Sequence, residues 1–321
     1  MRRRFTTIIT LITIPIALIA TIAASASPGS TSGLPQPVVP DGFGVNIHFT
    51  HFAPDELALF KNAGFGFIRM DLGWDGIEQT PGVYDFSHFD TLLSDLDSVN
   101  ARALLIFDYS NPLYDQGLSP YTDKGRAAFA AYAAAAAKHF AGRNVIWEIY
   151  NEPNGGFWKP KANVDAYATL VKVTVDAIRR ADPNAVILAG ATSGLPTDYI
   201  EALLRSGAMS KVNALSVHPY RGENPETASD DYDHTRMLIA RYTPKGQSPI
   251  PIICSEWGYS SVNGGVTEAK QAAYMVREYL ANLANGVNLT IYYDWKNDGS
   301  DPANNEHRFG TLTQDLQPKP A

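Results

Sequence analysis

The chain has 321 residues, of which 45% are hydrophobic and 18% are charged, and its formal net charge is −7. This balance excludes a disordered tail, a collagen-like repeat and a multi-pass membrane protein. The acidic charge also disfavours a nucleic-acid partner, because proteins that bind nucleic acids usually carry a basic face.

The first 26 residues have the pattern of a secretory signal peptide. Arginines at positions 2 to 4 precede a charge-free apolar run over 8–24, and Ala-Ser-Ala at 24–26 fits a cleavage site of small residues. An uncleaved membrane anchor is the alternative, but Pro15 and the cleavage pattern favour removal. We therefore predict an exported protein, secreted or periplasmic, whose mature chain begins at Ser27 and leaves the membrane. The general secretory and the twin-arginine route both stay open.

Residues 27–40 are rich in Ser, Gly and Pro and carry no charge, which predicts a flexible N-terminal segment before a single folded domain over 41–321. Cys254 is the only cysteine of the chain. An intramolecular disulfide is therefore excluded, and the fold must depend on a hydrophobic core.

Short apolar and β-branched runs alternate with longer helical patterns from Phe43 onward, which is typical of repeated strand–helix units in a parallel sheet. Eight runs predict strands, over 43–48, 65–71, 103–108, 145–152, 185–191, 214–218, 250–256 and 289–295. Seven segments between them predict helices, over 54–62, 87–99, 122–140, 164–181, 197–206, 227–242 and 267–285.

This cadence predicts a single-domain α/β fold, the (β/α)8 TIM barrel, with the active site at the C-terminal ends of the strands. A doubly wound sheet is the alternative, but no Gly-x-Gly-x-x-Gly follows the first strand. The residues after 295 are few and rich in Pro and Asn, so we expect no full eighth helix. Either the N-terminal segment covers the exposed face, or the barrel is less stable than an intact one, or natural sequence continues beyond Ala321.

Polar residues stand where the predicted strands end, as the barrel requires: His48, Arg69, Asp71, Asp108, Asn151, Glu152, His218, Tyr220, Glu256, Asp294 and Trp295. Two of them, Glu152 and Glu256, end the fourth and seventh strands and face the same mouth. Glycosidic bond hydrolysis needs such a pair, because one carboxyl protonates the leaving oxygen while the other attacks or activates water. Glu148 lies deeper on the same strand and is more simply a buried acid paired with an arginine.

Two segments, Trp-Glu-Ile-Tyr-Asn-Glu-Pro-Asn at 147–154 and Ser-Glu-Trp-Gly at 255–258, resemble the acid/base and nucleophile strands of clan A glycoside hydrolases. Within the clan, Gly-Val-Asn-Ile-His at 44–48, Phe-Ile-Arg at 67–69 and His-Pro-Tyr at 218–220 make the chain most similar to families 39 and 5 and to secreted endoglycosidases that trim bacterial exopolysaccharide. The similarity spans 43–320. It implies cofactor-free, retaining double displacement on the O-glycosidic bonds of a poly- or oligosaccharide, with Glu152 as acid/base and Glu256 as nucleophile.

The same resemblance implies roles for other residues. Asn151 would donate to the sugar 2-hydroxyl, Arg69 would keep Glu256 ionised, and Tyr220 would hydrogen-bond Glu256. The remaining candidates for sugar contacts are His218 in the innermost site, Trp295 as an aromatic floor, and His48, Trp257, Tyr109 and Trp158 in further subsites. A lone barrel with an open groove favours internal cleavage of long chains.

Metal chemistry is not expected from the sequence, because His48 and His51 straddle a strand end and no further Cys or His stands at a metal-ligand spacing. We predict a monomer that binds a polysaccharide or oligosaccharide and neither nucleic acid nor, after cleavage, a membrane. Two alternative functions remain open. One is a carbohydrate-binding barrel with weak or lost catalysis, and the other is a transglycosylase that uses the same covalent intermediate.

Overall fold

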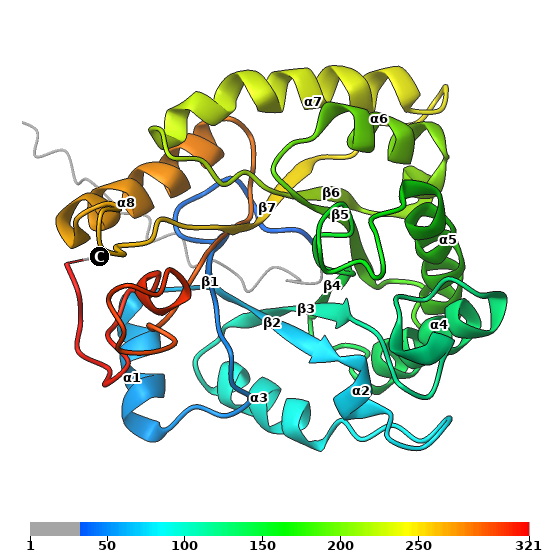
Figure 1. Cartoon of the computed structure of the whole chain (residues 1–321), viewed down its shortest axis with the longest axis horizontal. Helices are drawn as coiled ribbons and strands as arrows, with labels where there is room; N and C mark the ends of the chain where they lie inside the picture. The colour runs from blue at the N-terminus through cyan, green and yellow to red at the C-terminus, as the bar shows by residue number, and fades with distance from the viewer. Residues whose placement is uncertain (1–32, 321) are drawn as a thin grey trace, which may run out of the picture. The chain divides into compact units, whose positions relative to one another are not determined.

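The computed structural model describes residues 33–320, and in it eight parallel strands close into one barrel in sequence order (Figure 1). The strands are β1 (Phe43–Asn46), β2 (Phe67–Gly73), β3 (Arg102–Asp108), β4 (Ile146–Ile149), β5 (Val186–Ser193), β6 (Ala214–His218), β7 (Ile252–Trp257) and β8 (Thr290–Tyr292). β8 pairs with β1 and closes the barrel, with Phe43 opposite Thr290. The predicted TIM barrel is confirmed. The predicted signal peptide and residues 27–32 lie outside the described residues.

Helices surround the strands and lie in the connections between successive strands, two of them in the connection from β2 to β3. They are α1 (Pro54–Ala63), α2 (Trp74–Ile77), α3 (Ser87–Ser98), α4 (Asp123–His139), α5 (Val164–Ala181), α6 (Thr197–Arg205), α7 (Ser229–Tyr242) and α8 (Glu268–Ala284). Three of the longest begin at a side chain that caps the free backbone N–H groups: Thr122, Asn163 and Thr267 each accept a bond from the amide three residues on. No helix within 33–320 is long and apolar enough to cross a membrane.

No α-helix follows β8 as far as residue 320, where only a 3₁₀ turn over Glu306–Arg308 is present, as the sequence analysis expects. The segment after β8, red in Figure 1, lies between α1 and α8. An apolar groove remains at this place, with Leu59 and Leu280 on the two helices and Val39 and Pro40 of the predicted N-terminal segment in its lining. Residues 39–40 therefore cover part of the face that an eighth helix would occupy.

Two apolar layers hold the barrel together. Side chains that point inward, such as Leu104, Ile106 and Ile253, fill its interior, and Leu34 packs against this cluster. Outward-pointing side chains such as Phe107 and Trp147, whose rings stack at 4.8 Å, pack beneath the helices. The alternation of faces along each strand produces the two layers. It also leaves the strand ends, above the inner layer, for polar groups.

Candidate active site

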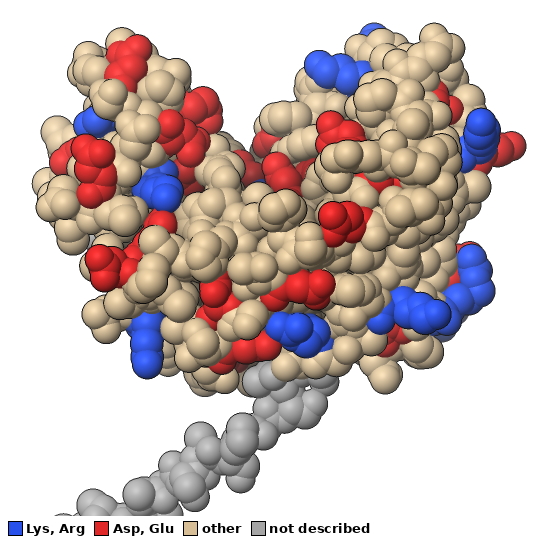
Figure 2. Space-filling model, turned by 90° about the horizontal axis from the view of Figure 1, so that it is seen from below, with Lys and Arg blue, Asp and Glu red and all other residues tan. Residues whose placement is uncertain are grey.

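A groove of about 550 Å³ opens at the C-terminal ends of the strands. Figure 2 shows a hollow at the top of the molecule, between two raised lobes, with acidic side chains on its walls. The lining residues are Asn46, His48, Arg69, Asp71, Tyr109, Asn151, Glu152, Phe157, Tyr220, Glu256, Tyr293, Asn305, Glu306 and Phe309. Six of the nine predicted site residues therefore meet in one cavity, both glutamates among them.

Glu256 lies near the end of β7 and is held by two donors. Arg69 Nη1 donates to its Oε2 at 2.5 Å, and the Tyr220 hydroxyl donates to its Oε1 at 2.8 Å. Burial alone would raise the pKa of Glu256, but the charges of His218 and Arg69 and the bond from Tyr220 outweigh burial and lower the pKa. The Glu256 carboxylate is therefore kept ionised.

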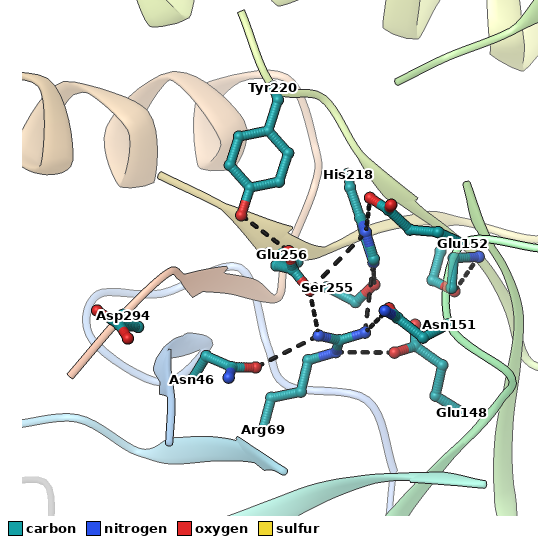
Figure 3. A network of polar contacts seen from close by, with 12 residues as sticks. Asn46, Arg69, Glu148, Asn151, Glu152, His218, Tyr220, Ser255, Glu256 and Asp294 are labelled. Carbon is teal, nitrogen blue, oxygen red and sulfur yellow. Dashed lines mark hydrogen bonds and ion pairs between the residues drawn. The ribbon is translucent and has the colours of Figure 1, made fainter. Parts of the chain in front are cut away.

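Arg69, on β2, is the centre of the buried network shown in Figure 3. Its side chain is 2% exposed. Besides Glu256, the guanidinium donates to Glu148 Oε2 at 2.9 Å, to Asn151 Oδ1 at 2.8 Å and to Asn46 Oδ1 at 3.3 Å. The prediction that Glu148 is a buried acid paired with an arginine is confirmed by this contact. One planar cation thus fixes four side chains from three strands or their ends, β1, β4 and β7.

Glu152 follows β4, where the backbone leaves the extended conformation. Tyr150 and Glu152 have positive φ angles of 67° and 43°, and the Glu152 amide donates to Ala191 O at 2.9 Å. The simple alternation of strand faces therefore ends at Ile149. Tyr150 turns into the outer layer, where its hydroxyl contacts Ser119 Oγ at 2.6 Å, whereas Glu152 faces the groove.

His218 connects the two glutamates. Its Nδ1 lies 3.1 Å from Glu152 Oε1 and 3.9 Å from Glu256 Oε2, and one oxygen of each carboxylate and a His218 ring nitrogen all lie within 4.8 Å of one another. Its Nε2 lies 3.1 Å from Ser255 Oγ. The His218 side chain is fully buried. It therefore lies behind the carboxylates and does not line the groove. This differs from the sequence analysis, which expects His218 in the innermost sugar site.

Asn151 has a fixed amide orientation. Its Oδ1 accepts from Arg69, so Nδ2 must be the donor toward Tyr109, whose hydroxyl lies at 2.9 Å. One N–H of the Asn151 amide then remains for a ligand in the groove, which is compatible with the role that the resemblance implies.

Trp295 and Trp257 do not lie where the sequence analysis places them. Trp295 is 2% exposed and points outward, where its Nε1 donates to Glu56 Oε1 on α1 at 2.9 Å. Trp257 is fully buried. The weaker candidate Trp158 is also buried, against Tyr150. None of the three lines the groove. The physical reason is that the strands end or shift register near these residues, so a period of two no longer fixes the facing side.

Aromatic side chains in the groove come instead from other positions. Tyr293 lines it two residues before Trp295, and its ring packs edge-on against Phe309 at 5.2 Å. On another part of the wall, Tyr109 and Phe157 stack at 5.2 Å with an angle of 14° between the rings. Phe157 is 46% exposed, so its face is available to a ligand. The sequence analysis missed Phe157 and Tyr293. Only the two glycines before Phe157, Gly155 and Gly156, indicate in the sequence that Phe157 lies in a loop.

Replacing Tyr220 with phenylalanine removes one of the donors to Glu256 and keeps the ring. Burial and the charge of Glu256 raise the pKa of Tyr220, so the hydroxyl is a donor throughout the range of assay. Its loss is expected to raise the pKa of Glu256 and move the acidic limb of the kcat profile to higher pH. At the optimum, kcat should fall about tenfold, which is the effect of losing one hydrogen bond to a charged group. An acidic limb that stays in place or moves to lower pH would contradict this assignment.

A sequence model of the family Cellulase (glycosyl hydrolase family 5) matches residues 37–299. A Beta-xylosidase of Geobacillus stearothermophilus is 26% identical in an alignment of 257 residues, and the alignment covers 67% of this chain and 50% of that protein. An Endoglucanase of Clostridium saccharobutylicum is 29% identical over 169 residues, which are 52% of this chain and 33% of that protein. The chain thus spans half or less of the length of these curated relatives.

Among solved structures, a family 39 glycoside hydrolase from Bacteroides cellulosilyticus WH2 superposes with a TM-score of 0.76 at 26% identity, over 87% of this chain and 61% of that one. A monomeric beta-xylosidase from Caulobacter crescentus CB15 superposes with a TM-score of 0.69 at 20% identity, over 90% of this chain and 69% of that one. At 20% identity the second likeness concerns the fold alone.

Proposed function

Because the chain belongs to the cellulase family, glycosyl hydrolase family 5, we propose that it hydrolyses O-glycosidic bonds of a poly- or oligosaccharide by retaining double displacement. Glu256 acts as the nucleophile and Glu152 as the general acid and then base. The observation that carries the proposal is the pairing of these two carboxylates across the groove, with His218 between them.

The distance between the carboxylates supports retention. Retaining enzymes hold the two groups about 5–5.5 Å apart, whereas inverting enzymes need roughly 6.5–9.5 Å to admit a water molecule. An oxygen of Glu152 lies within 4.8 Å of an oxygen of Glu256. A sugar carbon attacked by Glu256 would thus have its leaving oxygen beside Glu152.

The unequal surroundings of the two glutamates support their roles. Glu256 accepts from Arg69 and Tyr220, which stabilise its charge and suit a nucleophile. Glu152 contacts His218 but neither of these donors, and its side chain is 16% exposed. Surroundings without a fixed cation suit a carboxyl that must gain and lose a proton in each turnover.

Proton NMR of the first product is expected to show the same anomer as the substrate. β-Xylosides and soluble β-glucans are the first substrates to assay, since the curated relatives include a Beta-xylosidase and endoglucanases. The spectrum must be recorded before mutarotation equilibrates the anomers. Initial appearance of the opposite anomer would contradict the double displacement and would make Glu256 a base that activates water.

The mode of cleavage follows from the sizes of the products. We propose internal cleavage of long chains, and a ladder of oligosaccharides early in digestion of a polysaccharide is its expected result. Release of single sugars alone would count against it. Products longer than the substrate would indicate transglycosylation, and binding without any turnover would indicate a carbohydrate-binding barrel.

We also propose that the protein is exported after cleavage at residue 26 and acts as a monomer outside the cytoplasm. The support for export is the leader pattern in residues 1–26. The monomeric state of the beta-xylosidase from Caulobacter crescentus supports a monomer here by analogy.

A further inference from the structure

Three side chains that the catalytic pair does not use converge beside the groove. His48 follows β1, Asp294 follows β8, and Asp298 lies four residues further on. His48 Nε2 lies 3.5 Å from Asp294 Oδ2 and 3.9 Å from Asp298 Oδ2. One donor atom from each of the three lies within 4.8 Å of the other two. We call this group the β1–β8 cluster.

Asp294 has an unmet requirement for a positive charge or a donor. Its side chain is 1% exposed, and neither carboxylate oxygen has a hydrogen-bond partner among residues 33–320. Figure 3 shows Asp294 beside the Arg69 network without a bond to it. A buried acceptor without a partner is costly. Lys319 is the other basic group nearby, but its Nζ contacts Ser261 and Asn297.

A proton on His48 meets this requirement only in part. Hydrogen bonds from N–H to oxygen are about 2.7–3.2 Å long, and both carboxylate oxygens of the cluster stand farther from Nε2 than that. One N–H also points in one direction only, whereas two carboxylates face the ring nitrogen. A cation between the three atoms would contact them all.

Asn46 sets which ring nitrogen carries the free electron pair. Arg69 donates to Asn46 Oδ1, so the amide nitrogen Nδ2 is the group that lies 3.3 Å from His48 Nε2. An amide nitrogen can only donate, which makes Nε2 the acceptor and leaves the ring proton on Nδ1. Nε2 is therefore the ring nitrogen without a proton, and a cation among the carboxylates would replace the long 3.3 Å bond from Asn46 as the partner of its electron pair.

From this geometry we propose that the β1–β8 cluster binds one divalent transition-metal ion, with Zn²⁺ as the reference case. His48 Nε2, Asp294 Oδ2 and Asp298 Oδ2 are its three protein ligands. Bonds of about 2.0–2.2 Å in a tetrahedral site place neighbouring ligand atoms about 3.3–3.6 Å apart. The His48–Asp294 separation already meets this condition, and a small rotation of the exposed Asp298 side chain brings in the third ligand.

The donor set favours a transition metal over calcium or magnesium. Ca²⁺ takes six to eight oxygen ligands and Mg²⁺ an octahedron of oxygens, whereas one imidazole and two carboxylates are a familiar set for Zn²⁺. His48 is 40% exposed and lines the groove, so the remaining coordination position faces solvent there. The ion would join the end of β1 to the loop after β8. The site does not depend on the proposed hydrolysis.

Calorimetric titration of the mature chain, without a histidine tag, with Zn²⁺ tests the site. One equivalent is expected to bind, and Asp298→Asn should weaken this binding at least about tenfold. Asp298 is exposed and outside the core, so this variant should fold normally. Asp315→Asn is the matched control, because Asp315 is also exposed and lies outside the cluster. It should bind Zn²⁺ as the parent does.

Replacing Zn²⁺ with Co²⁺ provides a second measurement, because a four-coordinate site gives an intense visible absorption that Asp298→Asn should abolish. The proposal is overturned if the parent binds no Zn²⁺, if Asp298→Asn binds it as tightly as the parent, or if Asp315→Asn loses it equally. Tighter binding of Ca²⁺ or Mg²⁺ would overturn the assigned class of metal. None of these measurements requires glycosidase activity, so a failure of the proposed function would leave them interpretable.

Discussion

Glu256→Gln is expected to lower the rate of hydrolysis by roughly four orders of magnitude or more, as the loss of a nucleophile does in other enzymes. Glutamine keeps the shape of the side chain, but its single amide oxygen can accept from only one of the two donors, because Arg69 and Tyr220 donate to different oxygens of Glu256. It cannot supply the ionised oxygen that attacks the sugar carbon. Initial rates of reducing-end release, compared at equal concentration of folded protein, measure the loss.

Binding and rescue separate a catalytic loss from a structural one. Glu256→Gln should still bind the oligosaccharide products in a calorimetric titration. Azide added to Glu256→Ala should restore turnover with a glycosyl azide of inverted configuration, because azide then replaces the nucleophile. Azide added to Glu152→Ala should instead give the retained configuration, because it replaces the water that Glu152 activates. A Glu256→Gln variant within tenfold of the parent would remove Glu256 from the role of nucleophile.

Arg69→Met is expected to lower the free energy of unfolding by about 3–5 kcal/mol, the usual cost of leaving one partner of a buried ion pair alone. The buried partner is Glu148, which is fully inaccessible to solvent and whose Oε2 is bonded to Arg69. Its Oε1 has no partner within residues 33–320. Methionine fills similar space but donates nothing. Urea denaturation of the parent and variant gives the difference.

The double variant Arg69→Met/Glu148→Gln distinguishes the two consequences of losing Arg69. Removing the charge of Glu148 should restore most of the lost stability, because no ionised group is then left buried at that point. It should not restore activity, because Glu256 still lacks the guanidinium that lowers its pKa. Equal destabilisation of the single and the double variant would show that Arg69 stabilises the barrel by packing and not by pairing with Glu148.

The barrel was predictable, and so was the rim on which the proposed catalytic pair lies, because both depend on regular features. Apolar runs with a turn pattern between them specify eight strands, and parallel strands of a barrel end on the same rim. Glu152 and Glu256 end two of the predicted runs, so their position on one rim follows from the sequence, although the irregular backbone at Tyr150 and Glu152 turns Glu152 to the groove. The predicted pairing of Glu148 with an arginine, which the structure identifies as Arg69, has the same origin, since both side chains lie on regular strands and face inward.

The aromatic lining was not predictable, because it depends on backbone that is not regular. β8 ends at Tyr292, and the pairing of β7 with β8 shifts register between Cys254 and Trp257. Beyond such points a period of two no longer tells which way a side chain points. Trp295 therefore turned outward and Tyr293 inward.

The β1–β8 cluster was missed for a different reason. Spacing arguments find metal ligands that are close in sequence, as on one helix or in one loop. His48 and the two aspartates come from opposite ends of the chain and meet only because the last strand pairs with the first. The sequence contained the donors but no local pattern that joins them.

The pairing of the first strand with the last also constrains how the protein can be made. At synthesis rates of about 5–20 residues per second, β1 leaves the ribosome roughly 10 to 50 s before β8 does. During that time the hydrogen-bonding edges that β1 and β8 share in the finished barrel cannot be satisfied by each other. Such an edge can pair with any other exposed strand, so crowded expression should favour aggregates over closed barrels. Slower production at low temperature, or fusion partners that delay release until β8 has emerged, should raise the yield of folded protein.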